Sequence, residues 1–233
     1  MGPLCAVVLS ACLMLLATVP AASDGTAVLQ RFESRYADAR TLQVKFLERY
    51  TEGGRFVRAE AGTAYFLRPG KMRWDYAAPE RNTFLVDGKY VWFYSPVDRT
   101  ATRMPTKQSE DLRTPLAFLT THMKLSRLCS KIDLQKETDA VQTGDMVFRC
   151  QLRASRENSA NDGGFIHAVL FEVSPDGELK RIVVQEEAGM ELEFSFKNWE
   201  WDPPLDKGLF EFVPPRGVAI VNGLLPEAPG LRQ

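Results

Sequence analysis

The stretch YFLRPGKMRWDYAAPE, residues 65–80, decides how this chain folds. Large apolar side chains alternate with charged ones on both sides of Pro69-Gly70, as in two half-buried strands joined by a tight turn. The exception is Arg68, a permanently charged guanidinium that directly follows Phe66 and Leu67. The stretch therefore raises the question of what a charge binds at the end of an apolar strand.

The same period of two residues runs through most of the chain, with Gly-Gly, Pro-Gly, Ala-Pro and Asp-Gly turn signals at short intervals. One run is LQVKFLERY, residues 42–50. The clearest run is MELEFSFKNW, whose apolar side chains share one face: Met190, Leu192, Phe194 and Phe196. This pattern predicts antiparallel strands, roughly ten in all, and the absence of a βαβ rhythm argues against a parallel sheet.

Two segments have a helical pattern instead. Residues 24–39 place four apolar side chains on one helical stripe: Val28, Leu29, Phe32 and Tyr36. Residues 109–125 contain further apolar residues but are broken by Pro115, which predicts short, interrupted helical pieces. We therefore expect one good helix and one broken helical segment beside the strands.

Composition and charge narrow the class of protein. The chain has 233 residues, is 45% hydrophobic and 25% charged, and carries a formal net charge of −1. No linker-like change in composition occurs, so residues 23–233 are expected to form a single domain. The near-neutral charge and the lack of a basic cluster argue against nucleic acid as a partner.

The first 22 residues differ from the rest. Their apolar run is too short to span a bilayer comfortably and ends in small residues, which is typical of a cleaved export signal. Cleavage after Ala21 or after Ala22 fits equally well. A retained membrane anchor is one alternative, and a lipidated Cys12 within the lipobox-like LSAC is another, although the apolar run continues well past that cysteine.

Export also places the remaining cysteines in an oxidising compartment. Cys129 and Cys150 form an even pair, and a disulfide between them would contribute about 3 kcal/mol by the chain-entropy argument. Two buried free thiols are the alternative, because the spacing alone says nothing about geometry.

No catalytic, metal or cofactor motif is found. His122 and His167 stand alone in the sequence, and no GxSxG, HExxH, P-loop or GxGxxG pattern occurs. We therefore expect neither a catalytic residue, a metal nor a cofactor. A β-rich hydrolase remains the competing class, and it would need one of these histidines as a base.

Large aromatic residues recur along the predicted sheet: Phe46, Phe66, Trp74, Trp92, Phe194 and Phe196. They fill a core or line a groove for an apolar ligand, and the pattern alone favours the filled core.

Three motifs in order carry a resemblance to a known family. They are RPGKMRWDY (68–76) with Pro79, FLVDGKYVWFYSP (84–96), and LFEFVPPRGV (209–218). Together they resemble the outer-membrane lipoprotein carrier LolA from about residue 24 to residue 220. The resemblance implies an unclosed, strongly bent antiparallel β-barrel, mainly β and of roughly ten to eleven strands, with helices as a lid over an apolar cavity.

The resemblance also implies roles for individual residues. Arg68 matches the arginine that ties the lid shut by hydrogen bonding to helix backbone. Met72 matches an inward aromatic residue and Trp74 an inward tryptophan, so the expected cavity lining is Phe46, Phe66, Met72, Trp74, Trp92, Phe194 and Phe196. The expected second lid segment holds Leu116, Phe118 and Leu119.

The implied function is that of a periplasmic carrier rather than an enzyme. Such a carrier, a monomer, takes the acyl chains of lipoproteins from an inner-membrane ABC transporter and delivers them to an outer-membrane acceptor. Two relatives of the family stay open as alternatives: a carrier of another lipid, and a lipid-anchored acceptor similar to LolB.

Overall fold

The computed structural model describes residues 22–108, 114–121, 124–136, 139–153, 166–186, 189–223 and 225. The expected export signal, apart from Ala22, lies outside these residues, as does the lipobox-like Cys12. Ala22 begins the first helix, and the single-domain prediction for residues 23–233 stays a prediction.

The elements follow the periodicities of the sequence. The helical elements are α1 (Ala22–Ala37), η1 (Thr106–Gln108), η2 (Thr114–Thr120), α2 (Leu125–Leu128) and η4 (Lys207–Phe210). The strands are β1 (Thr41–Glu52), β2 (Arg55–Leu67), β3 (Lys71–Ala78), β4 (Thr83–Val86), β5 (Tyr90–Ser95), β6 (Thr100–Pro105), β7 (Cys129–Leu134), β8 (Met146–Leu152), β9 (Ile166–Val173), β10 (Leu179–Glu186), β11 (Met190–Trp201) and β12 (Ala219–Asn222).

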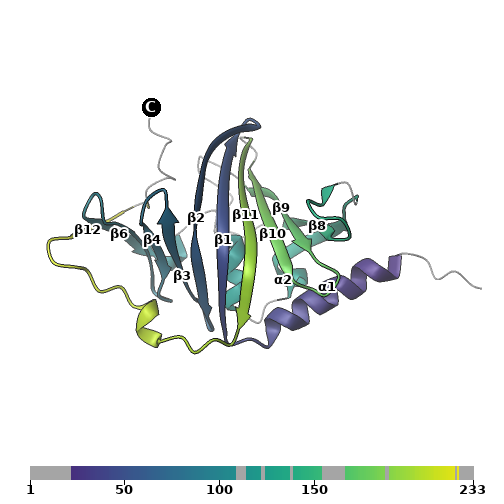
Figure 1. Cartoon of the computed structure of the whole chain (residues 1–233), viewed down its shortest axis with the longest axis horizontal. Coiled ribbons are helices and arrows are strands. Elements are labelled where there is room, and N and C mark those ends of the chain that lie inside the picture. The colour runs from purple at the N-terminus through teal and green to yellow at the C-terminus, as the bar shows by residue number, and fades with distance from the viewer. Residues whose placement is uncertain are drawn as a thin grey trace, which may run out of the picture.

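The strands form one curved sheet that does not close on itself (Figure 1). Their order is β12-β6-β5-β4-β3-β2-β1-β11-β10-β9-β8-β7, and each pair is antiparallel except β12 with β6. The expected unclosed, bent and mainly β architecture is confirmed. The sheet has 12 strands rather than ten or eleven, because the short C-terminal β12 adds to the edge.

Helical segments cover one face of this sheet, which we call the inner face. In Figure 1, α1 runs beneath the lower ends of β9, β10 and β11, and the teal helical segments lie behind the central strands. The predicted stripe of α1 points inward, since Val28, Phe32 and Tyr36 are buried and Leu29 packs beside them. Of the interrupted helical pieces predicted for residues 109–125, η2 lies within that range and α2 begins at its last residue, Leu125; residues 109–113, 122 and 123 lie outside the described residues.

The sheet carries apolar clusters on both faces. The large inner cluster joins the helices to the strands and includes Phe46, Phe66, Trp74, Phe171 and Phe194. A smaller outer cluster contains Leu85, Trp92, Ala101 and Phe210. The segment that follows β11 passes through η4 and ends beside β6, so it covers the outer cluster (Figure 1).

Candidate functional site

Arg68 lies at the point where β2 ends and α1 arrives. Its guanidinium donates from Nη1 to the carbonyl oxygens of Ala37 and Ala39, at 2.5 and 2.6 Å, and from Nη2 to that of Tyr36. These carbonyls belong to the last turn of α1 and the residues after it, where a helix leaves its acceptors without internal partners. The charge also complements the negative end of the helix dipole.

This contact is held under conditions that are unfavourable for a charge. Burial lowers the pKa of Arg68, while the carboxylates of Asp202 and Asp38 act in the opposite direction. The Nε–H of Arg68 is buried and meets no acceptor among the described residues. Arg68 therefore gains three charge-assisted hydrogen bonds but leaves one donor unsatisfied, so its contact with α1 stabilises less than its bond count suggests.

The three expected lid residues of η2 pack against α1 and the sheet. Leu116 and Leu119 are fully buried, and Phe118 is 6% exposed. The ring of Phe118 lies 5.9 Å from that of Phe32 on α1 and 5.5 Å from that of Phe171 on β9. A hydrogen bond from Gly70 N to Thr120 O joins η2 to the β2–β3 turn, and one from Leu125 N to Glu33 Oε1 joins α2 to α1.

Six of the seven expected lining residues lie on the inner face: Phe46, Phe66, Met72, Trp74, Phe194 and Phe196. Trp74 is at their centre, with ring centroids 4.7 Å from Phe46, 5.9 Å from Phe66 and 5.1 Å from Phe194. Gly62 lies beside this cluster and permits the close approach of β3, because a Cβ at that position would lie 2.0 Å from the backbone O of Asp75 and 3.0 Å from Cε1 of Phe46.

Trp92, the seventh expected lining residue, lies on the outer face, and this prediction was wrong. Its ring stacks on Phe212 at 4.8 Å, and its Nε1 donates to Asp87 Oδ2 at 2.9 Å. Its neighbours Val91 and Phe93 point inward instead. β5 is apolar on both faces because the C-terminal segment covers its outer side, so alternation could not tell the two faces apart.

The interior beneath α1 and η2 is packed with side chains. The pocket where Arg68 meets α1 has a volume of about 10 Å³, which is close to the space for a single water molecule. Its lining residues are Phe32, Glu33, Tyr36, Ala37, Arg68, Phe118, Thr121 and Leu125. The expected apolar cavity is therefore filled here, because aromatic rings from α1, η2 and the sheet meet in the middle. An apolar ligand would have to displace them.

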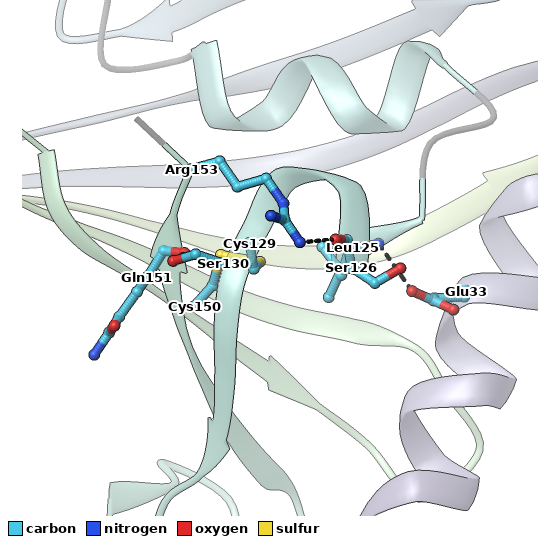
Figure 2. The surroundings of a disulfide bond; sticks show 8 residues. All are labelled: Glu33, Leu125, Ser126, Cys129, Ser130, Cys150, Gln151 and Arg153. Carbon is cyan, nitrogen blue, oxygen red and sulfur yellow. Dashed lines mark hydrogen bonds between the residues drawn. A yellow bond between two sulfur atoms is a disulfide. The ribbon is translucent and has the colours of Figure 1, made fainter. Parts of the chain in front are cut away.

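A disulfide joins β7 to β8 near one end of this antiparallel pair, where β7 begins and β8 ends (Figure 2). The Sγ atoms of Cys129 and Cys150 are 2.04 Å apart, and their Cα atoms 5.4 Å. Arg153, which follows β8, is hydrogen-bonded to α2: its backbone N donates to Leu128 O and its Nη2 to Ser126 O. The disulfide thus holds the base of α2, whose first residue is hydrogen-bonded to α1.

Sequence reasoning missed a polar patch at the far end of the inner face. Tyr76 donates to Glu48 Oε2 at 2.7 Å, and Arg58 pairs with Glu60 at 2.9 Å. Both carboxyl groups are at least nine-tenths buried. Glu48 follows Leu42, Val44 and Phe46 at even spacing, so its place in the alternation was a signal that a charge faces inward.

It also missed the polar contacts of α1 with the sheet. The hydroxyl oxygen of Tyr36 accepts from Leu179 N, and Trp199 Nε1 donates to Leu179 O at 2.8 Å. Burial raises the pKa of Tyr36 above its ordinary value, so the phenol stays neutral. The contact of Tyr36 with Leu179 orients the last turn of α1, whose carbonyl oxygens accept hydrogen bonds from Arg68.

The described part of the chain offers neither a metal site nor a membrane-spanning helix. There, no group of three or more His, Cys, Asp or Glu is placed to hold a metal ion. The side chains of His122 and His167 lie outside it. In the same part of the chain, every helix is too short or too polar to traverse a bilayer.

Comparisons with known proteins agree on one family. Residues 37–213 match the family described as "Outer membrane lipoprotein carrier protein LolA". An outer-membrane lipoprotein carrier protein of Methylococcus capsulatus is 31% identical, covering 82% of this chain and 85% of that protein. One of Nitrosomonas europaea is 27% identical, covering 92% and 96%. The crystal structure of an uncharacterised conserved protein from Thermus thermophilus has a similar fold, with a TM-score of 0.51, 13% identity, and 85% and 99% coverage.

Proposed function

The chain belongs to the LolA family of outer membrane lipoprotein carrier proteins, and from this premise we propose that it carries lipoproteins across the periplasm. It binds the acyl chains of lipoproteins released from the inner membrane and delivers them to the outer membrane, without a covalent step. The observation that carries the proposal is the contact of Arg68 with the last carbonyls of α1, above an inner face built of aromatic rings.

The inner face supplies the apolar surface that such a cargo needs. Each methylene group of an acyl chain exposed to water costs about 0.8 kcal/mol, so a lipoprotein cannot cross an aqueous compartment with its chains exposed. Phe66, Trp74 and Phe194 are at most 1% exposed and become available only when the lid moves. Acyl chains would then replace the rings of Phe32 and Phe118 against this wall.

The balance between closed and open forms is what makes delivery work. Binding must be tight enough to hold the chains and weak enough to release them, because the carrier has no energy source of its own. In the closed form, Arg68 holds α1 and Phe118 fills the interior. Loading breaks these contacts, and unloading restores them, so the closed form competes with the cargo and keeps its affinity moderate.

The partners follow from this role. The donor is an inner-membrane ABC transporter of the Lol type, and the acceptor is an outer-membrane protein that receives the same acyl chains. The carrier acts as a monomer, in the periplasm, after removal of the export signal. It needs neither cofactor nor metal, and it is not an enzyme.

The proposal is tested by forming a soluble complex. A triacylated lipoprotein in detergent is diluted below the critical micelle concentration with the purified mature protein, and the mixture is passed over a sizing column. We expect the lipoprotein to elute with the carrier at equal stoichiometry. The matched control is the same lipoprotein with its acylated cysteine changed to serine, which should elute alone.

A second measurement separates the family alternatives. Native mass spectrometry of the protein purified from its host identifies the bound lipid, and that of the intact mature N-terminus shows whether Cys12 bears a diacylglyceryl group. Failure to hold any lipoprotein in solution, together with a different bound lipid, would sink the lipoprotein proposal in favour of another cargo. A lipidated Cys12 would instead favour the anchored acceptor.

A further inference from the structure

The inner face changes character part of the way along three neighbouring strands. Near the lid it is apolar, and toward the β1–β2 hairpin β1, β2 and β3 bring in buried polar groups, with Tyr50 and Leu192 of the inner cluster beyond them. On β1 the change falls between Phe46 and Glu48, and on β3 between Trp74 and the hydroxyl of Tyr76. Glu48 faces Glu60 across the β1–β2 pair, so the polar part is continuous between the strands.

Trp74 lies on the apolar side of this boundary and carries an indole N–H that has no acceptor among the described residues. Its side chain is fully buried, and its Nε1–H meets no hydrogen-bond acceptor among the described residues. Around it are the rings of Phe46, Phe66 and Phe194, whose π faces are weak acceptors at best. A buried donor without a partner is rare in proteins and costs free energy that an apolar ring would avoid.

Two of the other three tryptophans have an acceptor for their indole N–H, which Trp74 lacks among the described residues. Trp199 Nε1 donates to Leu179 O at 2.8 Å, and Trp92 Nε1 donates to Asp87 Oδ2 at 2.9 Å. Trp201 Nε1 is also buried without an acceptor among the described residues, but this ring is only partly buried, at the edge of the inner cluster, and the guanidinium of Arg35 lies over it at 4.3 Å. Of the two tryptophans whose N–H has no acceptor among the described residues, Trp74 is the one that is fully buried in the inner wall.

We propose that the indole N–H of Trp74 donates a hydrogen bond to the carbonyl oxygen of an ester or amide that links an acyl chain to its polar head. This deepens the proposed function and rests on it. An acylated lipid consists of hydrocarbon, then a carbonyl linkage, then a polar head. The wall offers a matching order: apolar rings, then the N–H of Trp74, then polar side chains. With the chains toward Phe66 and the lid, the carbonyl falls at Trp74 and the head near Glu48 and Tyr76.

The surroundings select a neutral carbonyl rather than an anion. The adjoining polar part contains two buried carboxyl groups, Glu48 and Glu60, beside the single guanidinium of Arg58. A free fatty acid would place its carboxylate close to these groups, which is unfavourable in a buried site. Trp74 therefore favours ester-linked and amide-linked lipids over free fatty acids and over ether lipids, which lack the carbonyl.

The test removes the donor without changing the shape of the ring. Trp74 is replaced by benzothienylalanine, in which sulfur takes the place of the indole N–H, in the full mature protein. The dissociation constants of a diacylglycerol and of a dialkylglycerol with equal chains are then measured for both proteins. We expect the preference for the ester to fall by about three- to tenfold in the substituted protein, as for one lost hydrogen bond.

The matched control is Trp199, whose N–H already has a partner. Benzothienylalanine at position 199 should lower the melting temperature and leave the ester-to-ether ratio unchanged. In the natural protein, the diacylglycerol should also move the indole N–H proton resonance of Trp74 downfield, and the dialkylglycerol should not. An unchanged ratio for the substituted Trp74 protein, with no resonance shift, overturns the inference.

The outcomes keep the two proposals apart. A protein that holds a triacylated lipoprotein in solution but does not distinguish ester from ether refutes the role of Trp74 and leaves the carrier function standing. A protein that prefers the ester through Trp74 but never forms a lipoprotein complex supports the role of Trp74 and refutes the lipoprotein as cargo.

Discussion

The two faces of the sheet are covered by parts of the same chain, but in different ways. On the outer face, Phe210 is fully buried and Phe212 stacks on Trp92, and the covering segment continues into β12, which pairs with β6. On the inner face, α1 and η2 lie over the aromatic wall, and the three hydrogen bonds from Arg68 hold the end of α1.

This difference separates a cover that takes part in strand pairing from one that is held by side-chain contacts and a few hydrogen bonds. The outer cover is part of the sheet, because removing it would break the β12–β6 pairing and the hydrogen bond from Arg73 Nη1 to Leu209 O. The inner cover contributes no strand to the sheet, so displacing it would leave every strand paired. We therefore expect changes on the outer face to alter stability, and changes on the inner face to alter the handling of cargo.

The largest expected effect comes from the outer face. Phe210→Ala should lower the free energy of unfolding by about 3–5 kcal/mol, because it leaves a cavity in a fully packed cluster. Urea denaturation followed by tryptophan fluorescence measures this. Protein that stays folded should still solubilise lipoprotein at the natural stoichiometry. A selective loss of cargo binding at unchanged stability would contradict the comparison.

The next largest effect concerns the disulfide at the base of the lid. The double variant Cys129→Ser and Cys150→Ser should lower the free energy of unfolding by about 3 kcal/mol, the value for a closed loop of this length. Hydrogen exchange should become faster in α2 and β7 before it does in β3 to β6. Equal acceleration in both regions would show that α2 and β7 do not open separately from β3 to β6.

Arg68→Leu should change transfer more than stability. It removes three charge-assisted hydrogen bonds to α1, so the closed form loses its advantage and lipid settles deeper. We expect cargo binding to persist and transfer to an acceptor to slow by about tenfold or more. Arg73→Leu is the matched control, because Arg73 binds the outer segment; it should leave the transfer rate alone. Equal rates for natural and Arg68→Leu protein would reject the role of Arg68.

The smallest effect is electrostatic and lies away from the cargo. Burial raises the pKa of Asp145, and the nearby Glu172 raises it further. Because the folded protein binds this proton more tightly than the unfolded chain, the group favours folding below the unfolded pKa, and this contribution is lost as pH rises through the folded pKa.

Asp145→Asn should therefore stabilise the protein at pH 7, by less than about 1 kcal/mol, and this gain should vanish below about pH 4. Melting temperatures at both pH values measure it. A gain of the same size at low pH would exclude the ionised carboxyl as its cause. Lipoprotein transfer should not change, since neither Asp145 nor Glu172 belongs to the inner cluster.

Much of the fold could be predicted because most strands, and the main helix, bury only one of their faces. The alternation over 42–50 and 190–199 placed Phe46 and Phe194 correctly, and the helical stripe of α1 placed Phe32 and Tyr36. Trp92 was misplaced because β5 is buried on both faces. The lid residues Leu116, Phe118 and Leu119 were located through the resemblance, since a broken apolar segment has no periodicity of its own.

The sequence by itself determined the strands, the main helix, the family and the oddity of Arg68, because each depends on neighbours in the chain or on a short motif. The tertiary structure decided what distant segments do to one another. It brought Arg68 to carbonyls about thirty residues earlier, filled the expected cavity with rings, and joined Cys129 to Cys150. It also left the donor of Trp74 without an acceptor among the described residues. Packing and hydrogen-bond partners are set by three-dimensional proximity, which spacing along the chain does not encode.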